Sequence, residues 1–196
     1  MTRAMGRLIS TIAAALLGFI ALTAPVSAQI GGPSYQFIKA VKDKDLYKAN
    51  TILSEPGAAI IDHRDADSGD TALHIVVKRR DLTWVNYLLA KGANPNMEDR
   101  SGNTPLVLAA AQGFTDGVTA LIKAGADVNG RNRAGETPLI KAVQALNTPV
   151  VRVLIANGAK PDLADHVTGY SALDYAERDR RAGSILRLLK TPPKED

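Results

Sequence analysis

The sequence repeats itself with a period of about 33 residues, and this period restricts the possible folds more than any other feature. Three landmarks keep one register: a glycine, a hydroxyl residue and a leucine. They lie at Gly69, Gly102, Gly135 and Gly169; at Thr71, Thr104, Thr137 and Ser171; and at Leu73, Leu106, Leu139 and Leu173. A second glycine series, Gly92, Gly125 and Gly158, has the same spacing. A fixed period of this length is typical of proteins in which each repeat packs against the next.

Each repeat is predicted to form two short helices. In GNTPLVL (residues 102–108), Thr104 suits the helix cap and Pro105 the first helical position, where its missing N–H costs nothing. The apolar residues that follow lie three and four positions apart, which marks one buried face. A second helix with the same spacing then ends at a glycine of the second series. Leu106, Ala109 and Ala110 are expected to be packing residues.

These units resemble the ankyrin repeat, whose first helix carries the pattern T-P-L-H-x-A. The matching segments are DTALHIVV (70–77), NTPLVLAA (103–110), ETPLIKAV (136–143), YSALDYAE (170–177) and GADVN (125–129). The resemblance implies an all-α solenoid of helix-turn-helix units joined by β-hairpin-like loops. About five units are expected over residues 35–190: a degenerate first unit (about 35–65), then 66–98, 99–131 and 132–165, and a C-terminal cap unit (166–190). A polar tail (191–196) follows.

The first 28 residues have the three-part layout of a secretory signal peptide. Arg3 and Arg7 precede an apolar stretch, and Val26-Ser27-Ala28 provides a small-x-small site, so cleavage is predicted after Ala28. A flexible leader (29–34) is expected next. The stretch also resembles bacterial export signals, which predicts a periplasmic protein; an uncleaved membrane anchor is the alternative, although the stretch is short for a membrane span of roughly 20 residues.

Composition and charge exclude several functions. The whole chain has a net charge of +4, but removing two arginines leaves 22 basic and 20 acidic residues, so no nucleic-acid partner is expected. There are no cysteines, which excludes disulfides and thiolate chemistry.

The histidines are not expected to act in catalysis. His74 occupies the motif position where the resemblance implies a structural histidine that hydrogen-bonds adjacent repeats. His63 and His166 lie near aspartates, but without a metal-binding motif. No catalytic residue, metal or cofactor is predicted. An enzyme whose loop carboxylates or histidines converge from distant units stays open as an alternative.

Two basic clusters follow first helices, Lys78-Arg79-Arg80 and Arg178-Arg180-Arg181. They are interpreted either as solubilising surface or as a positive patch for an acidic partner. Trp84 is expected to pack on the outer side or to be partly exposed there, rather than to bind a partner.

The resemblance implies that partners bind to the hairpin tips and to the exposed ends of the first helices, on the concave face. The corresponding residues are Asp67, Ser68, Asp70, Lys78 and Arg79; Arg100, Ser101, Asn103 and Gln112; Arg133, Glu136 and Gln144; and Tyr170 and Arg178. Tyr170 and the arginines are the expected anchors.

We therefore expect a monomeric scaffold that binds a protein partner, with membrane contact only through an uncleaved signal segment (1–28). Its partner is predicted to be an envelope enzyme that it modulates or protects. A secreted, host-directed effector is a further alternative.

Overall fold

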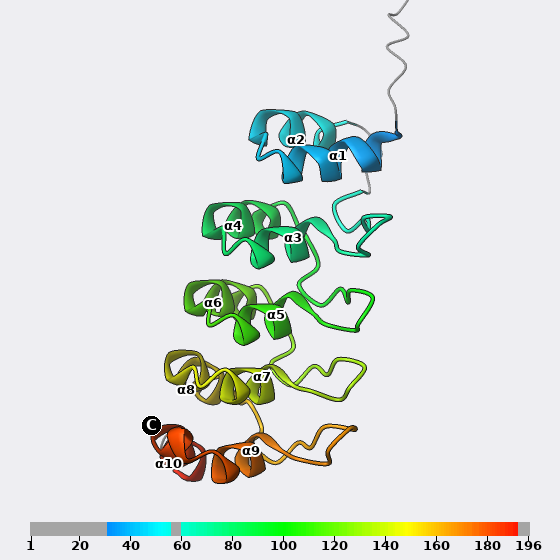
Figure 1. Cartoon of the computed structure of the whole chain (residues 1–196). Coiled ribbons are helices and arrows are strands. Elements are labelled where there is room, and N and C mark those ends of the chain that lie inside the picture. The colour runs from blue at the N-terminus through cyan, green and yellow to red at the C-terminus, as the bar shows by residue number, and fades with distance from the viewer. Residues whose placement is uncertain (1–30, 56–59, 192–196) are drawn as a thin grey trace, which may run out of the picture. The chain divides into compact units, whose positions relative to one another are not determined.

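Five helix pairs are stacked in sequence order within residues 31–55 and 60–191, which the computed structural model describes (Figure 1). We number the pairs units 1 to 5. They are α1 (Pro33–Lys42) with α2 (Leu46–Leu53), α3 (Ala72–Lys78) with α4 (Leu82–Ala90), α5 (Pro105–Ala111) with α6 (Thr115–Lys123), α7 (Pro138–Gln144) with α8 (Thr148–Ala156), and α9 (Ala172–Arg178) with α10 (Gly183–Lys190). A short 3-10 helix, η1 (Arg180–Ala182), links the last pair. The predicted all-α array of about five units is confirmed.

The stack has two helix layers. The first helices of the units contact one another in the order α1, α3, α5, α7 and α9, and the second helices α4, α6, α8 and α10 do the same. A hairpin precedes each of α3, α5, α7 and α9 and projects to one side of the stack (Figure 1). Isolated antiparallel bridges join Arg64 to Thr71 and Ala164 to Ser171. Each unit therefore adds one hairpin and one helix pair to its neighbour.

The helix starts follow from the local sequence. Thr104 accepts a hydrogen bond from the N–H of Val107, and Pro105 is the first helical residue, as predicted. The same cap occurs at Thr71, Thr137 and Ser171. The sequence analysis missed a second set of caps, in which Asp45, Asp81 and Asn147 begin α2, α4 and α8.

The core is built from small and branched apolar side chains. Leu106, Ala109 and Ala110 are fully buried in α5, which confirms them as packing residues. Alanine at these positions lets adjacent first helices approach closely. Trp84 is 3% exposed and its ring lies edge-on to Tyr87 at 5.6 Å, so it packs within unit 2 as expected.

One predicted boundary differs from the structure. Helix α1 begins at Pro33, so Pro33 and Ser34 are helical rather than part of a flexible leader. Proline at the first helical position explains the earlier start, because its backbone angle already suits a helix. The predicted signal peptide (1–28) and residues 192–196 of the predicted tail lie outside the described residues. Within the described part of the chain, every helix is too short or too polar to cross a membrane.

Candidate functional site

A buried polar residue organises each hairpin. Asp65, Asp99, Asn132 and Asp165 occupy equivalent positions, and all are at most 9% exposed. The Asp99 Oδ1 atom accepts from the N–H groups of Ser101 at 2.8 Å and Asn103 at 2.9 Å, which fixes the turn. The sequence analysis missed this series, although its spacing of 33 to 34 residues was a usable signal.

These hairpin carboxylates are held in the ionised form. The hydrogen bond from the Lys42 ammonium, with further hydrogen bonds from Ser68, lowers the pKa of Asp65 to about 2. At Asp165 burial alone would raise the pKa, but hydrogen bonds from Thr168 and from the Tyr175 hydroxyl outweigh it and lower the pKa. Both residues stabilise the hairpins, and neither is left free to act as a catalytic acid or base.

Hydrogen bonds to backbone carbonyl groups connect neighbouring hairpins. The Arg100 guanidinium donates to the carbonyls of Asp67 and Ala66, at 2.6 Å each. The N–H of Arg133 donates to the Ser101 carbonyl at 3.1 Å, and the N–H of His166 donates to the Ala134 carbonyl at 2.7 Å. The hairpin tips therefore form one continuous edge along units 2 to 5.

His74 has the structural role that the resemblance implied. It is fully buried, its Nε2 atom lies 2.9 Å from the Asn103 carbonyl of the next unit, and its Nδ1 atom lies 2.8 Å from the Thr71 hydroxyl. Burial lowers the pKa of His74, although the Asn103 carbonyl acts in the opposite direction. The neutral ring thus joins units 2 and 3.

His63 and His166 are both exposed, and His166 lies 3.3 Å from a guanidinium nitrogen of Arg131. Among the residues that the structure describes, no three His, Asp or Glu side chains are grouped so that they could hold a metal ion.

The predicted binding residues differ in their exposure to solvent and in the contacts that their side chains already make. Exposed positions are Asp67, Ser68, Lys78, Arg100, Ser101, Gln112, Arg133, Gln144 and Arg178; partly exposed positions are Arg79, Asn103, Glu136 and Tyr170; Asp70 is buried. The Lys78 ammonium pairs with Asp70 at 2.7 Å. The Arg178 guanidinium lies 4.0 Å from the centre of the Tyr170 ring, which joins two expected anchors in one contact.

Arg79 belongs to the fold rather than to the open surface. Its Nη1 atom donates to the carbonyls of Val41 at 2.7 Å and Lys42 at 3.2 Å, which are the last residues of α1. Its Nη2 atom lies 3.7 Å from Asp81. Arg79 therefore caps α1 and connects units 1 and 2. Because Lys78 is also paired, the cluster at residues 78–80 offers a partner less free charge than the positive-patch interpretation predicts.

A concavity lies in the middle of the stack, between the hairpins of units 3 and 4, with α5 as its floor. We name this space of about 650 Å³ the middle hollow. It is lined by Arg100, Ser101, Asn103, Val107, Leu108, Ala111, Asn132, Arg133, Ala134, Glu136 and Lys141. Five predicted binding residues meet here, Arg100, Ser101, Asn103, Arg133 and Glu136.

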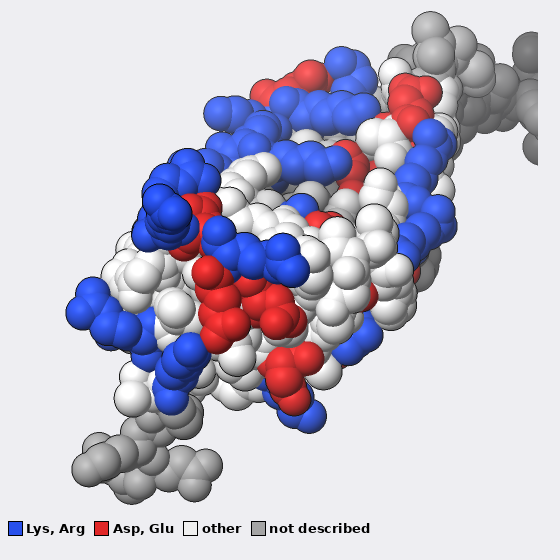
Figure 2. Space-filling view, turned by 60° about the horizontal axis from the view of Figure 1, so that its bottom comes forward, with Lys and Arg blue, Asp and Glu red and all other residues white. Residues whose placement is uncertain are grey.

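Other predicted residues, including Asp67, Lys78, Tyr170 and Arg178, lie outside this hollow. The sequence analysis missed Leu108 and Lys141. In the space-filling view, Lys and Arg side chains gather along two borders of the visible face, and uncharged side chains together with a group of Asp and Glu side chains lie between them (Figure 2).

Comparison with known proteins agrees with this architecture. Residues 37–132 match a family model described as ankyrin repeats (3 copies), and residues 121–176 match one described as ankyrin repeats (many copies). The chain is 35% identical over 85 residues to the oxysterol-binding protein homolog 1 of Saccharomyces cerevisiae, and 32% identical over 80 residues to the human 2-5A-dependent ribonuclease. These matches cover 42% and 41% of this chain, but 7% and 10% of the relatives.

A putative ankyrin repeat protein of fowlpox virus, FPV031, is 46% identical over 48 residues, which is 24% of this chain and 14% of that protein. The chain thus spans only a small part of the curated relatives it matches.

Proposed function

Because the chain belongs to the ankyrin repeat family, we propose that it is a scaffold that binds a protein partner on its concave face. Ankyrin repeats are generally scaffolds for protein–protein binding. The observation that carries the proposal is the middle hollow, where residues from two hairpins and two first helices line one accessible surface. Rigid stacking supports this role, since a preformed surface loses little conformational entropy on binding.

The proposed partner is a protein of the bacterial envelope that the scaffold restrains, protects or positions. Support comes from residues 1–28, whose basic start, apolar stretch and small-residue site fit an export signal. Export would place the mature chain, which begins at Gln29, in the periplasm. We propose that it acts there as a monomer without a cofactor.

Site-specific blocking tests the proposed surface. The natural chain has no cysteine, so one introduced cysteine can be labelled selectively with a bulky polyethylene glycol maleimide. We choose Gln112→Cys and Gln144→Cys, which are exposed beside the ends of α5 and α7, and Arg152→Cys, exposed on α8 in the second layer, as the control.

The labelled proteins are used to capture partners from an envelope extract. Labels at Gln112 and Gln144 are expected to abolish capture of a partner, and the label at Arg152 to leave it intact. Loss of capture with the Arg152 label alone would refute binding on the concave face. A photo-crosslinker at Gln112 would then identify the captured protein by mass spectrometry.

Cell fractionation tests the location. The proposal expects the protein in the periplasmic fraction, with an N-terminus at Gln29 by mass spectrometry. Retention in the membrane fraction with residues 1–28 intact would indicate an anchor instead. Recovery from the culture medium would favour a secreted effector over a periplasmic scaffold.

A further inference from the structure

The middle hollow differs in charge from the corresponding surfaces of the adjacent units. In unit 2 the hairpin residue Asp70 pairs with Lys78 at the end of α3. In unit 4 the equivalent hairpin residue, Glu136, pairs with Lys141 of α7 at 3.1 Å. Unit 3 has Asn103 at that hairpin position and Ala111 at the end of α5. The middle unit therefore lacks the ion pair that its neighbours form across the hairpin and the first helix.

The acidic and amide groups that line the hollow are already satisfied. Glu136 accepts from Asn132 through Oε2 at 2.8 Å, and from Lys141 through Oε1. Asn132 also donates to the Asn103 side-chain oxygen at 3.0 Å, and Asn103 donates to Asp99 at 3.1 Å. A ligand consequently finds few unpaired polar groups on this side. The floor at Leu108 and Ala111 is apolar and only partly covered.

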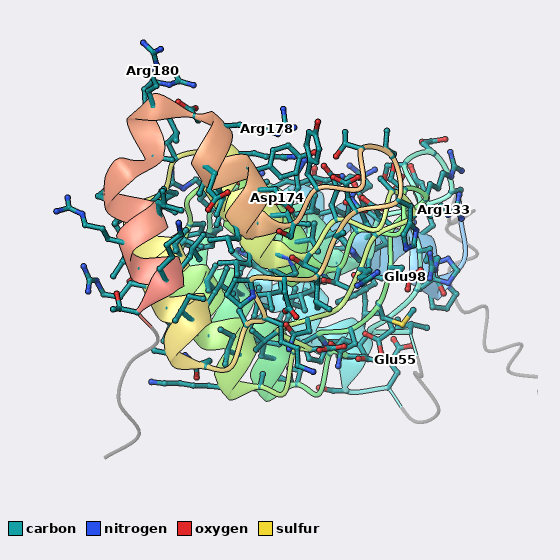
Figure 3. All side chains as sticks on the ribbon, turned by 90° about the horizontal axis from the view of Figure 1, so that it is seen from below. Glu55, Glu98, Arg133, Asp174, Arg178 and Arg180 are labelled. Carbon is teal, nitrogen blue, oxygen red and sulfur yellow. The ribbon has the colours of Figure 1, made fainter. Side chains whose placement is uncertain are left out.

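The two arginines of the hollow retain their charge. The Arg100 guanidinium is bound by two carbonyl oxygens and has no carboxylate partner. Arg133 uses its backbone N–H to join the hairpins, while its side chain is exposed (Figure 3). Among the charged side chains of described residues that line the hollow, Arg133 alone has no hydrogen bond or ion pair. A ligand that fits the middle hollow should therefore combine a negatively charged group with an apolar group.

We propose that the middle hollow binds an extended acidic segment of the protein partner, with an apolar side chain over Leu108 and Ala111 and a carboxylate on Arg133. This inference rests on the proposed scaffold function and adds the chemistry of the partner. A guanidinium and a carboxylate can form two parallel hydrogen bonds, which orients the bound segment. Burial of an apolar side chain adds affinity that does not depend on salt.

The same surface argues against a nucleic acid as the occupant. Single-stranded nucleic acids are bound by several cations together with aromatic side chains on which bases stack. The hollow has no aromatic side chain among its lining residues on which a base could stack. A peptide that alternates apolar and acidic side chains matches both the apolar floor and the exposed Arg133 guanidinium.

Fluorescence anisotropy with three labelled peptides tests the inference. The first peptide alternates leucine with glutamate, the second replaces each leucine by serine, and the third replaces each glutamate by lysine. Only the first is expected to bind well. The protein variants are Arg133→Gln and its matched control Arg152→Gln, which removes one exposed guanidinium from α8 in the second layer.

Arg133→Gln is expected to weaken binding of the leucine–glutamate peptide about tenfold, the scale of one lost charge-assisted contact, and Arg152→Gln less than about twofold. Unchanged thermal unfolding would show that both variants are folded. Equal weakening by the two variants would refute the inference, since it would indicate attraction to net charge alone. Binding of the lysine peptide, or no binding of any peptide, would also refute it.

Failure of this inference can be distinguished from failure of the proposed function. If a partner is still captured, and is blocked by the label at Gln112 but not affected by Arg133→Gln, the scaffold function stands and the acidic-segment inference falls. If no label on the concave face affects capture, the proposed function itself fails.

Discussion

Replacing Gly102 by alanine is expected to destabilise the stack more than the same change at Gly92 or Gly169, two glycines with similar backbone angles. Gly102 has φ +76°, and a Cβ atom there would lie 2.7 Å from the backbone nitrogen of Arg133 in the next hairpin. Gly169 occupies the same hairpin position in unit 5 with φ +72°, but nothing lies within 4 Å of its added Cβ. Gly92, which is exposed just after the end of α4 and has φ +88°, also has nothing within that distance. The two controls separate backbone strain from the contact between units.

The expected magnitudes follow from these two contributions. Alanine in the left-handed region costs about 1–2 kcal/mol, of which about 0.4–1 kcal/mol is recovered through the unfolded chain. Gly92→Ala and Gly169→Ala should therefore cost roughly 1 kcal/mol each. At Gly102 the backbone of Arg133 must also move, which adds about 1–3 kcal/mol of overpacking and weakens its hydrogen bond to Ser101. We expect a total of about 2–4 kcal/mol.

Urea unfolding followed by far-UV circular dichroism measures these differences. Equal dependence on urea concentration among the variants would show that the same structure unfolds in each. The expected order of cost is Gly102 above Gly92 and Gly169, which should be similar. If Gly169→Ala or Gly92→Ala costs as much as Gly102→Ala, the close approach of adjacent hairpins does not require glycine, and the explanation given for this repeated residue is wrong.

Three further predictions concern stability. Lys44 has φ +60° and is exposed, so Lys44→Gly should raise the free energy of unfolding by about 0.5–1 kcal/mol in urea titrations, and a loss of stability would contradict the backbone argument. Arg79→Glu should lower it by at least about 2 kcal/mol, because a carboxylate would replace the guanidinium that binds the last carbonyls of α1; an unchanged midpoint would refute the capping role. Asp65 has a folded pKa of about 2, below its ordinary value of 3.8, so its stabilising effect is present above pH 3.8 and is lost as the pH falls toward 2. Asp65→Asn should therefore flatten the loss of stability with acid, as measured by thermal unfolding across this pH range, and an identical pH profile would exclude Asp65 as a cause.

The repeat fold could be predicted because its determinants are local. A hydroxyl cap such as Thr104, a proline after it and a glycine beyond the second helix each act on the adjacent backbone. Where these residues recur in the sequence, the same helix pair therefore recurs in the structure. The aspartates that organise the hairpins act locally too, and Asp99 could have been recognised by its spacing. They were missed because the series changes identity at Asn132.

The charge of the surface could not be predicted in the same way. Lys78 and Asp70 lie eight positions apart, and their pairing depends on how the hairpin folds back toward the end of α3. The contact of Arg79 with α1 depends on the register of the degenerate first unit, which the period does not determine. Charged side chains that the sequence suggests are available to a partner are therefore partly engaged in hydrogen bonds and ion pairs between the elements.

The positions that keep the period and the positions that determine binding form different sets, for a physical reason. A residue such as Leu106 must satisfy the same packing in every unit, so it cannot distinguish one partner from another. The exposed end of the first helix has no such constraint, and it carries Lys78 in unit 2, Ala111 in unit 3 and Gln144 in unit 4. Because the stack fixes the spacing of these positions, each unit can change its surface chemistry without changing the fold. Specificity should therefore be sought where unit 3 departs from its neighbours, at the uncharged floor beside Arg133.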